Sequence, residues 1–190
     1  MGVNRTVLAL LGLVSLTTVS CIPGTIRDTE VSPQTITTVD NANILTDPQG
    51  RVQLELLSGW EEAPEKTLHD SADLYAKQED KELYLVVVGE ASSAIATDDL
   101  REVAQNYRQL ITEALDQVET VEAQNVGQIS GYSAIQYEIR GTLDNKSIVY
   151  LHTTVSVDDM YYQVVAWTSA DGYLRHREEL QQIINSFSPV

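Results

Sequence analysis

A continuous apolar run from Leu83 to Val88 restricts the folds open to this chain more than any other feature. Successive side chains of a strand point to opposite faces, so an unbroken run places apolar groups on both faces at once. Each face then needs a covering layer, as in the centre of a sandwich. The run therefore predicts a central strand with packed layers above and below it.

Two amphipathic segments can supply those layers. Apolar residues recur at three- and four-residue spacing from Leu100 to Val118, and Asp98 or Asp99 can cap the start of this helix. A second, closing helix is predicted near the C-terminus. Its apolar side is expected to contain Tyr173, Leu174, Leu180, Ile183, Ile184 and Phe187.

Most of the remaining sequence from residue 50 onward is typical of antiparallel strands. Apolar and polar residues alternate over Val52–Leu56, and a β-rich stretch separates the two predicted helices. Asp144–Lys146 and Asp158–Asp159 stand where hairpin turns belong. Because hairpins join antiparallel strands, we predict an α+β fold, an α/β/α sandwich with a central, mainly antiparallel sheet covered by helices. One domain is expected, over residues 50–190.

The first twenty residues are typical of an export signal. Arg5 is basic, residues 7–16 are almost wholly apolar, and small residues precede Cys21. The apolar run is shorter than the roughly 20 residues that a membrane-spanning helix needs, so a permanent transmembrane anchor is not expected. We predict that residues 1–20 are removed on export. Residues 21–49, rich in polar residues and without sustained periodicity, are predicted to form a flexible polar tether.

Cys21 is the only cysteine, and it stands at the end of this signal. An apolar run, small residues and then Cys resemble the lipobox of bacterial lipoproteins, in which the cysteine becomes the acylated first residue. The lipobox prefers Leu three residues before the cysteine, whereas this sequence has Thr18 there. The resemblance implies an exported protein anchored by lipid at Cys21 to a bacterial membrane, on its periplasmic side. Cleavage by an ordinary signal peptidase, which would leave a soluble exported protein, is the alternative.

The formal net charge of −16 argues against nucleic acid as a partner, because phosphate backbones and an acidic protein repel each other. A lone cysteine excludes an internal disulfide, and His69, His152 and His176 do not have zinc-ligand spacing. Neither a Gly-rich dinucleotide motif nor a P-loop is present. We therefore expect no metal and no cofactor, and a monomeric domain whose stability comes from its core.

The segment "TLHDSADLY" contains the strongest candidates for chemistry. His69, Asp70 and Asp73 carry groups that can ligate a metal or form an acid/base pair. A polar turn explains them equally well, because these three groups leave the fourth ligand of a metal site unassigned. Asp158–Asp159 supplies too few oxygens for calcium and is interpreted as a turn.

No catalytic nucleophile is evident in the sequence. Ser130 has no recognisable base beside it, and no G-x-S-x-G motif is present. His152 is expected to alternate out of a strand, and His176 to lie beside the apolar stripe of the last helix, both in structural roles. We therefore expect that the protein is not an enzyme.

Three stretches mark turns and element ends of this arrangement: "SGWEEAP" after the first strand, "GQISGYSAIQYEI" before the later strands, and "YYQVVAWTSADGYLRHREELQQIINSF" at the end. With the order of elements over residues 50–190, they resemble the PsbP-like domain, an α/β/α sandwich of photosystem II extrinsic proteins and their bacterial relatives. The resemblance implies an accessory or assembly protein of a membrane complex. In a photosynthetic bacterium such a lipoprotein would lie on the thylakoid-lumen side.

Two functions remain open from the sequence. The first is a non-catalytic, membrane-tethered lipoprotein that acts as an interaction or assembly module for a membrane protein complex, with a photosystem as one candidate. Its interaction surface is expected around Trp60, Asp158, Tyr161 and Tyr162, because aromatic side chains anchor interfaces well. The two tyrosines should differ in exposure unless both faces of their strand are covered. The second is an exported lipoprotein that binds a small ligand or a cation, which a pocket would favour.

Overall fold

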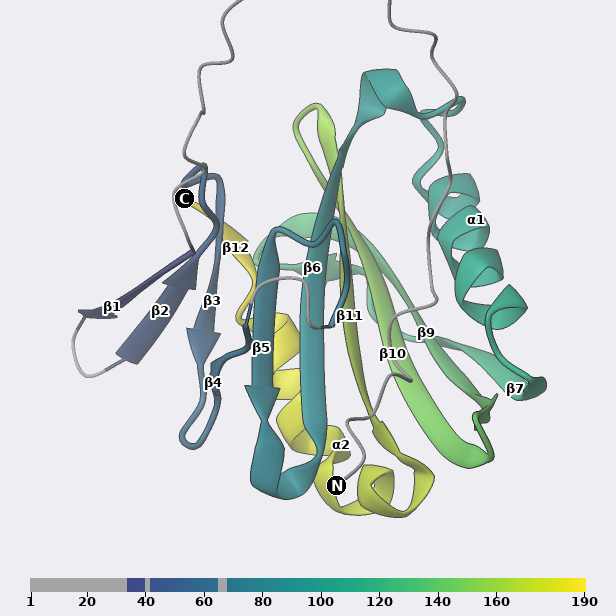
Figure 1. Ribbon diagram of the computed structural model, residues 1–190. Helices are drawn as coiled ribbons and strands as arrows, with labels where there is room; N and C mark the ends of the chain where they lie inside the picture. The colour runs from purple at the N-terminus through teal and green to yellow at the C-terminus, as the bar shows by residue number, and fades with distance from the viewer. Residues whose placement is uncertain (1–33, 40–41, 65–67) are drawn as a thin grey trace, which may run out of the picture.

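The computed structural model describes residues 34–39, 42–64 and 68–190, whose arrangement is shown in Figure 1. The predicted signal peptide, Cys21 and the first part of the predicted tether lie outside the described residues. Within the described part of the chain, no helix is both long enough and apolar enough to cross a membrane.

A sheet of eight strands forms the centre of the fold, and its neighbouring strands are all antiparallel. Hairpin turns at Asp144–Asn145 and Asp158–Asp159 join successive strands, as predicted. In spatial order the strands are β4 (Glu61–Glu62), β5 (Leu74–Gln78), β6 (Leu83–Ala91), β11 (Met160–Ser169), β10 (Lys146–Val157), β9 (Tyr132–Leu143) and β7 (Gln117–Gln124), with β8 (Gln128–Ile129) paired to β9.

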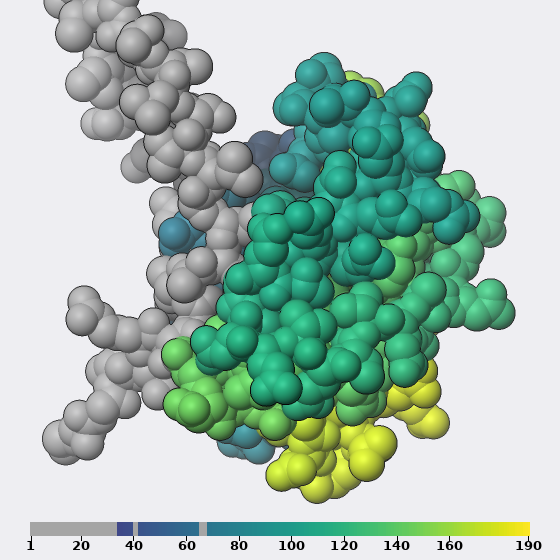
Figure 2. All heavy atoms as spheres, turned by 90° about the vertical axis from the view of Figure 1, so that its right-hand side faces the viewer, coloured from purple at the N-terminus to yellow at the C-terminus, as the bar shows by residue number. Residues whose placement is uncertain are grey.

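Two helices cover opposite faces of this sheet. Helix α1 (Leu100–Glu113) packs on β9 and β10, and α2 (Ala170–Asn185) packs on β10 and β11 from the other side. Figure 2 views the molecule from the α1 side, where the atoms of this helix cover the sheet. Two short 3-10 turns, η1 (Glu79–Lys81) and η2 (Ser92–Ala94), flank β6. The predicted α+β sandwich with a mainly antiparallel sheet is confirmed.

The apolar run that begins at Leu83 lies in β6, between β5 and β11. Leu83, Leu85 and Val87 are fully buried in the core on the α2 side. Val86 is buried in a separate core on the α1 side. Both faces of β6 therefore carry apolar side chains into packed layers, which confirms the predicted central strand.

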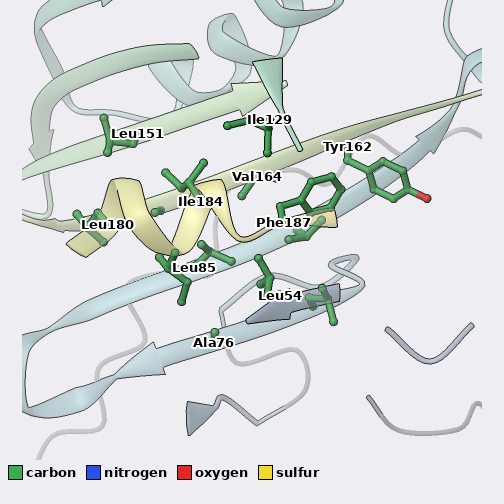
Figure 3. Close-up of a cluster of buried hydrophobic side chains, with 14 of the residues drawn as sticks. Leu54, Ala76, Leu85, Ile129, Leu151, Tyr162, Val164, Leu180, Ile184 and Phe187 are labelled. Atoms are coloured by element: carbon green, nitrogen blue, oxygen red, sulfur yellow. The ribbon is translucent and has the colours of Figure 1, made fainter. Parts of the chain in front are cut away.

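The core under α2 is built almost wholly from apolar side chains (Figure 3). Leu180, Ile184 and Phe187 are completely buried there, beside strand residues such as Val164. Full burial of such a side chain stabilises the fold by roughly 1.5–3 kcal/mol relative to leaving it exposed. This layer is therefore a main source of the stability of the domain, which was expected to come from an apolar core.

Both helices depart in detail from the predicted pattern. Helix α1 ends at Glu113 rather than Val118, because the Asp116 N–H donates to the Thr142 carbonyl (2.8 Å) and the chain turns back to the sheet edge. Val118 lies in β7 and is 42% exposed. Leu174, predicted on the apolar side of α2, is 84% exposed, because one residue rotates a helical side chain by about 100°, beyond the buried stripe.

A second, four-stranded sheet stands beside the first (Figure 1). Leu45 and Leu54 from this sheet are fully buried in the same core as α2. Its strands, all antiparallel, are β1 (Thr35–Val39), β2 (Ala42–Thr46), β3 (Val52–Leu56) and β12 (Ser188–Pro189). The end of the chain therefore closes the sheet that the earliest strands begin.

The predicted start of the domain at residue 50, and the predicted tether up to residue 49, are wrong for the described residues before that point. Strands β1 and β2 lie there, and the Gln34 side chain donates to the Ala63 and Tyr75 carbonyls. All five residues of β1 are exposed, so main-chain pairing with β2 stabilises it without any apolar period in the sequence. Because the sequence of β1 has no regular spacing of buried apolar residues, the start of the domain was predicted at residue 50, after this strand.

Candidate functional site

A groove of about 470 Å³ lies between α2 and the connection that follows β7, and we call it the amide groove. Arg177, Val126 and Gly127 contribute to its lining. The other lining residues all carry side-chain amides: Gln124, Asn125, Gln128, Gln136, Gln181 and Asn185. Asn and Gln make up 20 of the 190 residues of the chain but six of these nine, so the amides are concentrated at this place.

The local structure explains how these amides come together. Arg177, Gln181 and Asn185 are four residues apart on α2, so they follow one line along the helix. Gln124 is the last residue of β7, and it pairs across the strands with Gln136 of β9. One helix face and one strand end therefore form the two walls of the groove.

Some of the groove amides are already hydrogen-bonded within the protein. Arg177 Nη2 donates to Gln124 Oε1 at 3.0 Å, which links the two walls. Gln181 Nε2 donates to Asn185 Oδ1 (3.0 Å) on the same helix. Asn125 and Gln128 are exposed, and their side-chain amides make no hydrogen bond to the described residues. Donors and acceptors on these two residues are therefore available to a ligand.

A buried carboxylate anchors Arg177 beside the groove. Glu138 accepts hydrogen bonds from Arg140 Nη2 (2.6 Å) and from the Tyr173 hydroxyl (2.6 Å), and Arg177 Nε lies 3.8 Å from Glu138 Oε2. Burial, together with the bond to Glu138, raises the pKa of Tyr173, so this phenol stays a neutral donor. Arg140 and Arg177 therefore both lie against this one carboxylate. The network holds the groove wall in place and contains no free acid or base.

A second hollow, of about 420 Å³, runs along the loop 92–98. All of its lining residues belong to this one loop. The Thr97 hydroxyl donates to Glu102 Oε2 (2.9 Å), and the Asp98 carbonyl accepts from Tyr161. Its polar groups therefore serve the start of α1, which makes this hollow the weaker candidate for a binding site.

The structure does not bring His69, Asp70 and Asp73 together as a catalytic or metal site. His69 Nδ1 accepts from the Ser71 N–H (3.1 Å), and burial lowers the pKa of His69. Asp73 accepts from the Gly89 N–H (2.7 Å) and from Arg51 Nη2 (3.1 Å), while desolvation raises the pKa of Asp73 despite these bonds. Among the described residues, no three His, Cys, Asp or Glu side chains are grouped to hold a metal ion.

The interaction surface predicted from the sequence is wrong for three of its four residues. Trp60 and Tyr161 are each 5% exposed and Tyr162 is 2% exposed. Packed layers cover both faces of the strand that carries the two tyrosines, and Trp60 packs into the core on the α2 side. Trp60 Nε1 donates to Glu179, and the Tyr162 ring packs on Phe187 at 5.4 Å between centroids (Figure 3). Asp158 alone is exposed, in the β10–β11 turn.

The remaining candidates make local structural contacts. Ser130 Oγ donates to the Phe187 carbonyl (2.6 Å), and His176 Nδ1 lies 3.5 Å from Glu179 Oε2. His152 does not alternate out of its strand as predicted but is completely buried under α1, where its ring stacks on Tyr107. Burial lowers the pKa of His152 to about 4.

The amide groove was not predicted from the sequence. One signal for it was present, since Arg177, Gln181 and Asn185 recur at four-residue spacing on the polar side of a predicted helix. Helices commonly carry such polar stripes toward solvent, so the stripe alone does not indicate a site. The groove also needs a second wall, formed by the end of β7 and the connection after it, and only the fold shows that this wall faces α2.

The sequence matches no protein-family model and no curated protein. Solved structures do resemble the fold. Cyanobacterial PsbP (CyanoP) from Synechocystis sp. PCC 6803 has a TM-score of 0.56 at 12% identity, over 88% of this chain and 99% of that chain. LpqN of Mycobacterium tuberculosis, described as involved in cell envelope biogenesis, has a TM-score of 0.54 at 14% identity, over 73% and 83%.

A eukaryotic protein has a similar fold. The Ran-binding protein Mog1p of Saccharomyces cerevisiae has a TM-score of 0.52 at 13% identity, over 78% of this chain and 95% of that chain. At such identities the likeness concerns architecture alone, because one fold hosts many functions. The chain therefore has a PsbP-like fold.

Proposed function

We propose that this chain is an exported, lipid-anchored protein whose domain binds a partner at a membrane surface and does not catalyse a reaction. The observation that carries the proposal is that the residues with possible catalytic side chains form structural hydrogen bonds instead. His69, Asp73 and Ser130 each hydrogen-bond to a main-chain group. A nucleophile and its base must lie within hydrogen-bond reach of each other. No hydrogen bond joins any two of these three described side chains.

The position of Cys21 supports the anchor. The described fold begins at Gln34, so twelve residues, 22–33, separate it from Cys21. Because each residue of an extended chain spans at most about 3.5 Å, the domain would stay within about 45 Å of the acylated cysteine. This limit keeps the domain beside the membrane surface, where a partner that belongs to a membrane complex is accessible.

The similar structures support binding as the use of this scaffold. LpqN is described as involved in cell envelope biogenesis, and Mog1p as a Ran-binding protein. The likeness to cyanobacterial PsbP makes a photosystem one candidate for the membrane complex that this domain helps to assemble. A second candidate function, an exported protein that binds a small ligand, is favoured by the amide groove.

Membrane fractionation of the native cells tests the anchor. We expect the parent protein in the membrane fraction, the Cys21→Ser variant in the soluble exported fraction, and a Thr18→Leu control, which restores the preferred lipobox residue, in the membrane fraction. Retention of Cys21→Ser at the parent's level would contradict the lipid anchor.

Crosslinking in intact membranes tests the binding role. The parent should yield a reproducible protein partner, and Cys21→Ser should yield much less of it, because the unanchored domain is diluted away from the membrane. Turnover of a substrate by the purified protein, lost when His69 or Ser130 is replaced, would overturn the non-catalytic role.

A further inference from the structure

We propose that the amide groove binds a neutral oligosaccharide. This inference rests on the proposed function, since a protein exported to the cell envelope meets glycans there, and it names the ligand class of that domain. It begins from the lining, in which six of nine residues carry an amide and none is acidic, in a chain with 28 Asp and Glu residues.

The chemistry of the lining matches hydroxyl groups. A side-chain amide offers two N–H donors and one carbonyl acceptor, and a sugar hydroxyl both donates and accepts. Neighbouring amides such as Gln181 and Asn185 therefore suit the adjacent hydroxyls of a sugar ring. The exposed amides of Asn125 and Gln128, which bond to no described residue, supply the free groups that such a ligand needs.

The charge of the groove favours a neutral ligand over a charged one. Arg177, the one charged residue in the lining, already donates to Gln124 and lies beside the buried Glu138. A cationic ligand would find no carboxylate in the lining. An anionic ligand would approach against the formal net charge of −16.

The shape and apolar content of the groove favour a glycan over a peptide. Peptide ligands gain much of their affinity from apolar or aromatic anchors that fill pockets, and Val126 is the one large apolar residue of this lining. The groove volume of about 470 Å³ falls in the range of small-ligand sites and is open at the surface, which suits a short segment of a longer chain.

The fold holds the groove in a preformed state. The bond between Arg177 Nη2 and Gln124 Oε1 connects α2 to β7, and Gln136, which is 1% exposed, is fixed by its bond to Thr153 Oγ1 (2.8 Å). A ligand therefore meets Gln124 and Gln136 in positions that the fold already fixes, which reduces the entropy lost on binding.

Nuclear magnetic resonance of the purified full chain tests the proposal directly, because the side-chain NH2 groups of Asn and Gln give their own signals. The probes are maltotriose, cellotriose and tri-N-acetylchitotriose, titrated at millimolar concentrations. We expect at least one to shift the NH2 signals of Asn125, Gln128 and Gln181 with saturation. Gln128→Ala should weaken that binding about three- to tenfold, the loss expected for one hydrogen bond.

Gln182→Ala is the matched control, since Gln182 is an exposed amide on the same helix that does not line the groove. This variant should bind the trisaccharide as the parent does. Absence of saturable shifts with all three sugars, equal weakening by Gln182→Ala, or binding of acetylated, amidated trialanine in their place would overturn the proposal. The anchor is tested separately by fractionation, so loss of sugar binding and loss of membrane anchoring are distinguishable.

Discussion

The two faces of the central sheet are each covered by one helix, yet the two cores differ in kind. Under α2, Leu180, Ile183, Ile184 and Phe187 are all fully buried among apolar side chains. Under α1, the centre is aromatic and polar, with His152 between Tyr107 and Tyr137, at centroid distances of 5.1 and 6.3 Å. The centre of one core is therefore apolar, whereas the centre of the other contains a histidine that can take up a proton.

The polar centre under α1 is incompletely satisfied. His152 Nε2 lies 2.9 Å from Gln163 Oε1, and the Thr154 hydroxyl donates to the same oxygen. His152 Nδ1 and Gln163 Nε2 are buried and have no hydrogen-bond partner among the described residues. Such a group costs about 1–3 kcal/mol. Thr168 Oγ1, near Gly172 of α2, is unpaired as well, but a hydroxyl of this kind does not titrate.

The largest expected effect is on the α2 side, where Phe187→Ala would remove a fully buried ring. We expect the free energy of unfolding to fall by about 3–5 kcal/mol, because the cavity adds to the lost apolar transfer. Urea denaturation measures this loss. Leu174→Ala, on the exposed side of α2, is the control and should change stability by less than about 0.5 kcal/mol. A loss below about 1 kcal/mol for Phe187→Ala would show that the α2 core is not the stronger one.

The second effect concerns the α1 side and depends on pH. The pKa of His152 is lowered to about 4, whereas an exposed histidine has a pKa near 6.5, so the unfolded chain takes up the proton first as the pH falls. Neutral His152 thus makes its full contribution to the free energy of unfolding above about pH 6.5. This contribution is lost progressively toward pH 4, by roughly 3 kcal/mol in total.

His152→Gln isolates this contribution, because an amide keeps a donor near Gln163 and does not titrate. Urea denaturation of both proteins at pH 7 and pH 4.5 gives the difference in unfolding free energy at each pH, in which the titrations of other groups largely cancel. As the pH falls, the unfolding free energy of the variant should rise relative to that of the parent. Equal pH dependence in the two proteins would show that His152 reaches solvent or a proton partner in the folded state.

The smallest expected effect compares how the two helices begin. The Asp99 carboxylate accepts from the Arg101 N–H at 2.8 Å, and the Ser169 hydroxyl accepts from the Gly172 N–H at 3.2 Å. Asp99→Ala and Ser169→Ala should each lower the unfolding free energy by about 1 kcal/mol. Asp98→Ala is the control for the first, since its side chain does not cap α1.

Hydrogen exchange would extend that comparison to the individual layers. Loss of the Asp99 cap should speed exchange in the first turn of α1 while α2 keeps its protection, because the two helices belong to separate cores. Faster exchange in both helices would mean that the two cores open together.

The fold was predictable where the sequence has a long apolar pattern or residues typical of a tight turn. Leu83–Val88 marks the central strand, and Asp144 and Asn145, both with positive φ, mark the β9–β10 hairpin. The start of the small sheet was not predictable, because β1 is held by main-chain pairing with no buried side chain. Leu174 shows the same limit in a helix, where spacing identifies a stripe but not its width.

The candidate site was less predictable than the fold. Tyr161 and Tyr162 were expected at an interface because they are aromatic, yet layers on both faces bury them. The amide groove requires Gln124 to face Gln181, which are far apart in the sequence and meet only through the packing of α2 beside β7. Short polar motifs are visible in a sequence, whereas a wall shared by two distant elements is not.

The pairing of β12 with β3 has a consequence for the time course of folding. Ser188 stands opposite Gln53, and their side chains are hydrogen-bonded across 135 positions of the chain. Loops of this length close slowly, because the chain must search a large volume before the contact stabilises anything. Strand β3 pairs with β2 on one side, so during folding its other edge stays unpaired until Ser188 and Pro189 reach it. A chain that ends before Phe187 would thus leave an unfilled core and an open sheet edge, which is a template for pairing with another chain.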